Sequence, residues 1–191
     1  MGAELSLPRR ALSVEDYHRM GEAGLFRSDE RIELIQGDLI TMAPIGGPHL
    51  HVVSVLAQLL TLAVKRSAFV SVQNPISLPP DNEPQPDIAL LSPEFWGRKD
   101  VPNAGDVLLV IEVADTTLAR DREIKLPLYA RHGIPEAWLF DLASEQMTIH
   151  RDPGPQGYRA VMSPDRNATI SPGTKSGVTI LLSEIWPPKR D

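Results

Sequence analysis

A nearly continuous apolar run with one acid inside it, VLLVIEV at residues 107–113, limits what this chain can fold into. Such a run is typical of a strand that is buried on both faces near the centre of a sheet. Glu112 is the exception, because an ionised carboxylate in that environment is costly unless a cation or hydrogen-bond donors compensate it. The run therefore predicts a central strand whose single charged group has a partner.

Patterns on either side of this strand predict helices packed on a mixed sheet. Apolar residues recur every three or four positions over residues 49–65 and 121–132, which predicts two helices. The second should end at Gly133, and Pro127 should either kink it or mark where its first turns end. Ser13 followed by Asp16 predicts the cap of a short first helix. Further strands are expected at residues 69–72, 76–78, 87–91, 136–142, 147–151 and 158–162, with a hairpin at 31–40. The expected fold class is α/β (α+β).

The length and composition set the organisation and the chemistry. With 191 residues, 42% of them hydrophobic, we expect one domain over residues 13–191 after a flexible N-terminal arm of residues 1–12. The chain has no cysteine, so any metal must bind to oxygen or imidazole ligands. No apolar run approaches a membrane-spanning length, and neither end carries a signal pattern, so we expect a cytoplasmic protein without a membrane partner.

The net charge argues against one class of nucleic-acid binder. A formal charge of −6 does not suit a protein that coats nucleic acid by bulk electrostatics, although a local basic groove is compatible with it. An acidic excess arises both when carboxylates gather around a cation and when a surface is simply soluble. Charge alone leaves both readings open.

Asp87 is the natural partner for Glu112 at a metal site. It follows Pro86 and begins the apolar run DIALL, so two neighbouring strands would each direct one carboxylate at the same point. A Mg²⁺ or Mn²⁺ ion relieves the resulting repulsion. The alternative pairs Glu112 with an arginine and lets Asp87 cap a turn, and these two residues alone do not decide between the readings.

A third group favours the metal site. Helical spacing places Asp121, Lys125 and Tyr129 on one face of the helix that follows Glu112. By itself this spacing fits an ordinary exposed ion pair. Combined with two carboxylates, the lysine supplies what phosphodiester hydrolysis needs: an activated water and neutralisation of the charged phosphorane. The chain has no thiol and no GxSxG, Walker-type or HExxH motif that would indicate other chemistry.

The segments RIELIQGDLITMAPIGGPH, QPDIALL, VLLVIEVAD and DREIKLPLYARHGIPEAWLFDL occur in this order. They resemble the Uma-two family of restriction-endonuclease-like proteins in the PD-(D/E)XK superfamily, from about Tyr17 to about Ile185. The resemblance implies a mixed central sheet flanked by helices. It also implies a DNA endonuclease that depends on Mg²⁺ or Mn²⁺.

Carried over by position, the resemblance assigns Pro86-Asp87 and Glu112 as the metal-binding acids, helped by a main-chain carbonyl near Val113. The superfamily lysine usually follows the second acid by two residues, where this chain has Ala114. Lys125 fits the branches in which that lysine lies on the next helix. It would steady the attacking hydroxide or the transition state.

The same resemblance points to three further polar residues. Glu33 would orient water or a second metal, His49 would donate to phosphate or shuttle a proton, and Glu136 would brace the helix of Lys125. The ordinary alternatives are a solubilising strand-edge acid for Glu33 and a loop contact for His49. Five basic residues could line a groove for a nucleic-acid backbone or form a solvated face: Arg98, Lys99, Arg120, Arg122 and Arg131.

Two expectations concern partners. The missing near-motif lysine leaves open an inactive nuclease fold that binds nucleic acid or a protein. Because cleaving two strands favours two active sites, we also expect a homodimer. The apolar stretch VTILLSEIW at residues 178–186 and the first hairpin are the candidate dimer surfaces.

Overall fold

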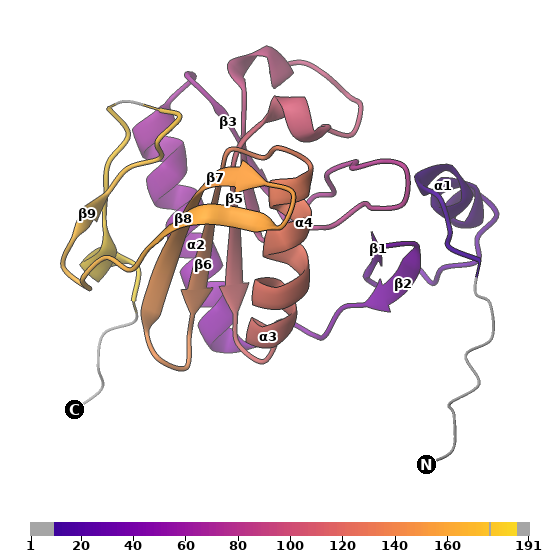
Figure 1. The fold of residues 1–191 in the computed structure, drawn as a ribbon, viewed down its shortest axis with the longest axis horizontal. Coiled ribbons are helices and arrows are strands. Elements are labelled where there is room, and N and C mark those ends of the chain that lie inside the picture. The colour runs from indigo at the N-terminus through magenta and orange to yellow at the C-terminus, as the bar shows by residue number, and fades with distance from the viewer. Residues whose placement is uncertain (1–9, 176, 187–191) are drawn as a thin grey trace.

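The computed structural model describes residues 10–175 and 177–186 (Figure 1). Its centre is a six-stranded sheet in the order β3-β4-β5-β6-β7-β8. The strands are β3 Phe69–Val72, β4 Ile88–Leu91, β5 Val107–Ala114, β6 Glu136–Asp141, β7 Gln146–Gly154 and β8 Gly157–Met162. Neighbours pair antiparallel except β5 and β6, which are parallel. The mixed sheet confirms the expected fold class.

The parallel pair requires a long crossover, and helical residues supply it. Between β5 and β6 the chain forms α3 Leu118–Arg120, the π-helical turn η3 Asp121–Lys125 and α4 Leu126–Arg131. Pro127 lies in the first turn of α4, so it marks where the first turns of the crossover end. In the π-helical turn before it, the N–H of Leu126 donates to the carbonyl of Asp121. In such turns the hydrogen bond joins residues five apart, where an α-helix joins residues four apart. They occur often at functional sites.

Helices cover both faces of the sheet (Figure 1). On one face, α2 Gly47–Val64 packs over alternate residues of β4 and β5 such as Leu90 and Ile111. On the other face, α4 packs over the intervening residues, such as Ala89 and Val110. Since side chains alternate along a strand, Glu112 shares the α4 face with Val110. The sheet therefore directs the buried acid at the helical crossover.

Smaller elements surround this core. Helix α1 Val14–Glu22 has the predicted capping box of Ser13 and Asp16, and a hairpin joins β1 Ile32–Ile35 to β2 Asp38–Thr41. Figure 1 shows both beside the sheet on the N-terminal side. The C-terminal part forms β9 Thr169–Ile170 and β10 Ile180–Leu181. Short 3₁₀ turns occur at η1 Pro93–Phe95, η2 Ala104–Asp106 and η4 Leu182–Glu184.

Three sequence expectations need comment. Residues 76–78 form no strand, because Ser77 and Leu78 make only isolated bridges to Asn103 and Asn82. The stretch 178–186 was wrongly expected to be a dimer surface, since five of its apolar residues are buried in the core: Val178, Ile180, Leu182, Ile185 and Trp186. Residues 1–9 of the expected arm lie outside the described residues, while the N–H of Leu12 donates to the carbonyl of Gly37.

By length and composition alone, α2 could cross a membrane, a property shared by core helices of soluble proteins. Five of its residues are buried against the sheet: Val52, Val53, Leu56, Leu60 and Val64. Two of its leucines, Leu50 and Leu62, are exposed.

Candidate active site

Asp87 and Glu112 lie side by side where β4 begins and β5 ends. Ile88 pairs with Ile111, so the residue before β4 lies next to Glu112. The main-chain N–H of Val113 donates to Asp87 Oδ2 at 2.8 Å, which fixes the carboxylate against β5. Only 8% of Asp87 and 3% of Glu112 are exposed. The two acids meet at one place, as their positions in the sequence predict.

Lys125 completes this buried cluster from the crossover. Its Nζ lies 2.9 Å from Glu112 Oε1 and 3.2 Å from Glu33 Oε2, and it donates to the Gln85 carbonyl at 3.4 Å. The side chain is 2% exposed, so the reading as an exposed surface ion pair is wrong. Ala114, in the usual lysine position, is buried in the core on the same face. The ammonium therefore reaches the second acid from the helix instead of from the strand.

The other two members of the helical trio also face this cluster. The hydroxyl of Tyr129 donates to Glu112 Oε1 at 2.6 Å, and Thr117 donates to Asp121 Oδ2 at 2.5 Å. Tyr129 is fully buried and Asp121 is 3% exposed. Tyr129 is thus a core residue that also holds the second acid in place.

His49 approaches Asp87 from the first turn of α2. Its Nε2 lies 3.0 Å from Asp87 Oδ1. This hydrogen bond raises the pKa of His49 above its ordinary value. Burial alone would raise the pKa of Asp87, but His49 and the Val113 N–H outweigh it and lower that pKa. Asp87 is therefore ionised, and His49 is hydrogen-bonded to it directly.

Glu33 is brought to the site from β1. It is fully buried, and the N–H of Gln85 donates to its Oε2 at 3.1 Å, the oxygen that also faces Lys125. Its other oxygen, Oε1, is buried without a hydrogen-bond partner among the described residues. A buried acceptor left open in this way fits a position where a buried water donates.

Burial sets the charge state of the Glu112–Lys125 pair. Loss of water raises the pKa of Glu112 to about 8, and Lys125 opposes part of that rise. For Lys125, burial lowers the pKa, but the carboxylates of Glu112 and Glu33 outweigh it and raise the value above the ordinary one. Lys125 therefore stays protonated at neutral pH, and Glu112 ionises less readily than an ordinary glutamate.

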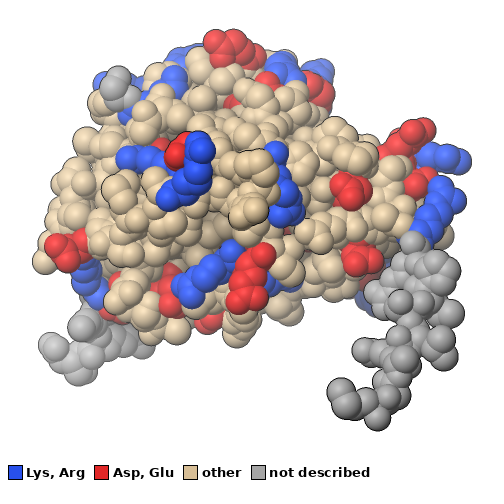
Figure 2. Space-filling model, in the orientation of Figure 1, with Lys and Arg blue, Asp and Glu red and all other residues tan. Residues whose placement is uncertain are grey.

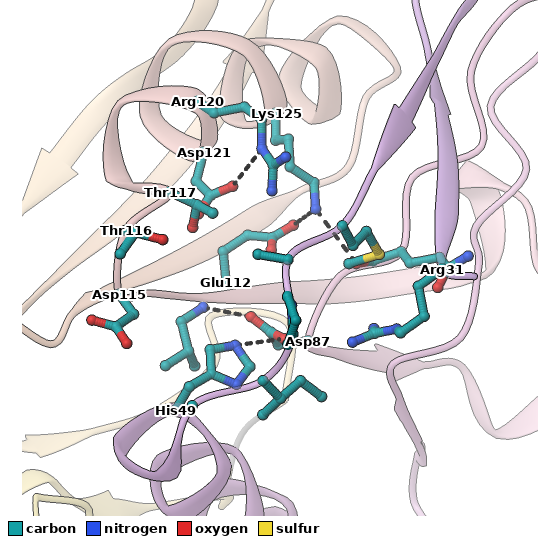
Figure 3. A pocket seen from close by; sticks show the side chains of 17 residues that line it. Arg31, His49, Asp87, Glu112, Asp115, Thr116, Thr117, Arg120, Asp121 and Lys125 are labelled. Carbon is teal, nitrogen blue, oxygen red and sulfur yellow. Dashed lines mark hydrogen bonds and ion pairs between the residues drawn. The ribbon is translucent and has the colours of Figure 1, made fainter. Parts of the chain in front are cut away.

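These residues surround a cavity of about 80 Å³. By this measure a single water needs roughly 10–15 Å³, so the cavity has room for an ion with part of its water shell. Figure 3 shows the acids and Lys125 in its interior, with His49 below them. The loop that enters α2 and the loop after β5 form its rim, at Met42, Ala43, Pro44, Ile45, Gly46, Asp115, Thr116 and Thr117.

The donor set at the cavity suits a hard divalent cation. Four carboxylates and three basic side chains line the cavity: Asp87, Glu112, Asp115 and Asp121 with Arg31, Arg120 and Lys125. Glu33 adds a fifth carboxylate behind Lys125. Among the described residues, no three histidine or acidic side chains are already arranged to hold a metal. Mg²⁺ commonly takes one or two carboxylates and completes its shell with water and phosphate. Asp87 and the outer oxygen of Glu112 match that requirement.

Some expected residues lie elsewhere. Glu136 does not brace the helix of Lys125: it receives hydrogen bonds from Trp138, Arg151 and the N–H of Gly173. Of the five basic residues expected at a groove, only Arg120 lines the cavity in the part of the chain that the structure describes. Figure 2 shows positive and negative side chains interspersed over the face drawn, without a continuous basic surface.

Arg31 is a cavity residue that the sequence did not reveal, and Asp115 is another. Arg31 immediately precedes β1 and lines the cavity opposite the crossover helix. A single arginine at the start of a hairpin is an ordinary surface feature, so no sequence pattern distinguishes it. Its position follows from how the hairpin joins the segment before β4, where Leu34 and Glu83 exchange main-chain hydrogen bonds.

Comparison with known proteins agrees with the fold. A solved structure from Anabaena variabilis ATCC 29413, described as "a putative nuclease belonging to DUF820", superposes with a TM-score of 0.69 at 17% sequence identity, covering 91% of this chain and 97% of that one. At this identity the likeness shows the fold. No curated protein matches the sequence. The model of the Uma2 family, described as "putative restriction endonuclease", matches residues 14–183. The chain therefore belongs to the Uma2 family.

Proposed function

We propose that the protein is a DNA endonuclease that uses Mg²⁺ or Mn²⁺ to hydrolyse phosphodiester bonds. The observation that carries the proposal is the placement of Asp87 and Glu112 side by side at one cavity, with Lys125 on the second acid. The family description supports nuclease chemistry. A divalent cation bound there would activate a water and neutralise charge on the phosphate.

The chain's own residues prepare the site for that chemistry. Val113 and His49 fix the two oxygens of Asp87, so its carboxylate is oriented before any ligand arrives. Tyr129 and Lys125 both bind Glu112 Oε1, which leaves Oε2 of that carboxylate for the cavity. Preorientation of this kind lowers the cost of ordering groups when substrate binds.

Glu33 and His49 have supporting roles in this proposal. Glu33 anchors Lys125 with one oxygen and offers the other to a water. The Nε2 of His49 is already bound to Asp87, which favours a role in positioning that acid over direct donation to phosphate. Asp121 adds negative charge beside Lys125 and helps keep it protonated.

Plasmid cleavage tests the proposal. Wild-type protein with Mg²⁺ or Mn²⁺ should nick supercoiled DNA, and Asp87→Asn should abolish nicking while preserving the circular dichroism spectrum. Asp152→Asn is the matched control, since Asp152 pairs with Arg159 on the exposed β7–β8 hairpin. Undiminished cleavage by Asp87→Asn would overturn the assignment. A homodimer belongs to the proposal because cutting both strands favours two sites.

One observation favours a second function, nucleic-acid binding without cleavage. Lys125 is enclosed by three acceptors and is 2% exposed, so its charge is already committed. A module of this kind would bind a DNA duplex but neither bind Mn²⁺ at millimolar concentration nor nick plasmid. Calorimetry with Mn²⁺ therefore separates the two functions.

A further inference from the structure

The three cationic side chains at the cavity, Lys125, Arg120 and Arg31, differ in how many of their N–H donors already have an acceptor. The ammonium of Lys125 has three N–H groups and three acceptors, on Glu112, Glu33 and the Gln85 carbonyl. None of its donors is left for a substrate. If a phosphate enters this cavity, another side chain must supply the donors that meet it.

Arg120 has unused donors. Its Nε is buried without a hydrogen-bond partner among the described residues, although the side chain as a whole is 28% exposed. The nearest carboxylate oxygen, Oδ1 of Asp121, lies 3.9 Å from that Nε, which is beyond hydrogen-bond range. Leaving a buried guanidinium donor open is costly unless a ligand satisfies it.

Arg31 is the second cation at the cavity whose guanidinium makes no close ion pair with a described carboxylate. Across residues 10–175 and 177–186, no carboxylate oxygen lies within the 4.0 Å that defines an ion pair with it. Figure 3 shows its side chain extending toward Asp87 from the hairpin side, whereas Arg120 enters from the crossover side. The two guanidinium groups therefore flank Asp87 and Glu112 from opposite walls of the cavity.

We propose that Arg31 and Arg120 are the groups that bind the phosphates of the DNA backbone at this site, one on each side of the two acids. The inference rests on the proposed function and adds its substrate contacts. A guanidinium presents five N–H donors in a planar fork that matches two phosphate oxygens at once. Lys125 then serves as an internal counter-ion of Glu33 and Glu112. The acidic protein binds a polyanion through two local arginines and does not need a broad basic surface.

Binding without cleavage tests the inference. A short fluorescein-labelled DNA duplex is titrated in EDTA and, separately, in Ca²⁺, with anisotropy as the readout. Arg31→Ala and Arg120→Ala should each weaken binding about tenfold and reduce the slope of log K against log salt concentration by about 0.9. Lysine replacements should keep the salt slope but weaken binding, because they retain charge and lose the planar fork.

Arg131→Ala is the matched control. It removes the same charge from the exposed end of α4, outside the cavity, and should bind as the wild type does. Arg31→Gln and Arg120→Gln replace any alanine variant that loses its circular dichroism spectrum. If both cavity variants bind like Arg131→Ala, or if the wild type binds no duplex in either buffer, the inference is overturned.

Failure of this inference and failure of the proposed function give different results. Asp87→Asn should lose cleavage and keep duplex binding, because it removes no cation. Loss of cleavage in Asp87→Asn together with unchanged binding in both arginine variants would overturn only the inference. Cleavage that persists in Asp87→Asn, with weakened binding in the arginine variants, would overturn only the proposed catalytic site.

Discussion

Lys125 Nζ and Glu112 Oε1 lie 2.9 Å apart in the interior, one from the crossover helix and one from the central strand. The pair joins the two elements that bracket the candidate active site. Because both groups are buried, their geometry is fixed by packing as well as by charge. Because the candidate site is also part of the packed interior, substitutions there should change both stability and activity.

Replacing Lys125 with Met should lower the free energy of unfolding by about 3 kcal/mol, since it leaves buried carboxylates without their cation. Urea unfolding at neutral pH measures the effect. Lys99→Met, at an exposed position, is the control and should change stability by less than about 0.5 kcal/mol. Adding Glu112→Gln to Lys125→Met should recover part of the loss. A fully stable Lys125→Met protein would show that the pair does not hold the crossover.

Removing the hydroxyl of Tyr129 should affect both stability and cleavage. Tyr129→Phe deletes the hydrogen bond to Glu112 and should cost about 1–2 kcal/mol while releasing the second acid from its fixed orientation. Tyr158→Phe is a close control, because its hydroxyl donates to the Ile134 carbonyl away from the cavity. We expect both variants to lose stability and only Tyr129→Phe to lose cleavage rate. Equal cleavage by the two would argue against a positioning role for Tyr129.

The contribution of His150 to stability should decrease in mild acid, opposite in sign to the contribution from the raised pKa of Glu112. Burial, assisted by Arg122, lowers the pKa of His150 to about 4 from its ordinary 6.5. The unfolded chain therefore takes up a proton at higher pH than the folded one, so the stability linked to this group is present above pH 6.5 and decreases as the pH falls towards 4. Since the side chain is partly exposed, the expected loss by pH 5 is about 1 kcal/mol.

Unfolding of His150→Gln at pH 7 and pH 5 checks this point. Between pH 7 and pH 5 the stability of His150→Gln should rise relative to that of the wild type by about 1 kcal/mol, because the variant lacks the group that must be protonated. If the stabilities of the two proteins change in parallel, His150 does not contribute to the pH dependence.

Much of the fold follows from the sequence because apolar periodicity reports burial. The run at 107–113 was read as a central strand, and β5 is flanked on both sides in the sheet and packed on both faces. Ile76 and Leu78 are also apolar and buried, yet only isolated bridges form at residues 76–78. Strand formation needs a neighbouring backbone, which a local pattern does not reveal. The β9–β10 pair was missed because two-residue strands have no period.

The site was predictable where charge conflicts with its surroundings. Glu112 is an acid in an apolar strand, and Asp87 is the acid at the start of the preceding apolar run. Glu136 shows the limit of that reasoning. It also begins a buried strand, but its charge is already compensated by Arg151, the residue opposite it on β7. Arg31 carries no such conflict in sequence. Its place at the cavity comes from tertiary packing alone.

Calorimetric titration of Mn²⁺ tests the central claim most directly, because it measures the metal site apart from turnover. The wild type should bind Mn²⁺ at millimolar or lower concentration, and Asp87→Asn and Glu112→Gln should each abolish the heat of binding. Asp152→Asn, whose carboxylate is paired on the exposed hairpin, should bind as the wild type does. Heat of binding that survives in Asp87→Asn and Glu112→Gln, or is missing from the wild type, would contradict the assignment of these two acids as a metal site.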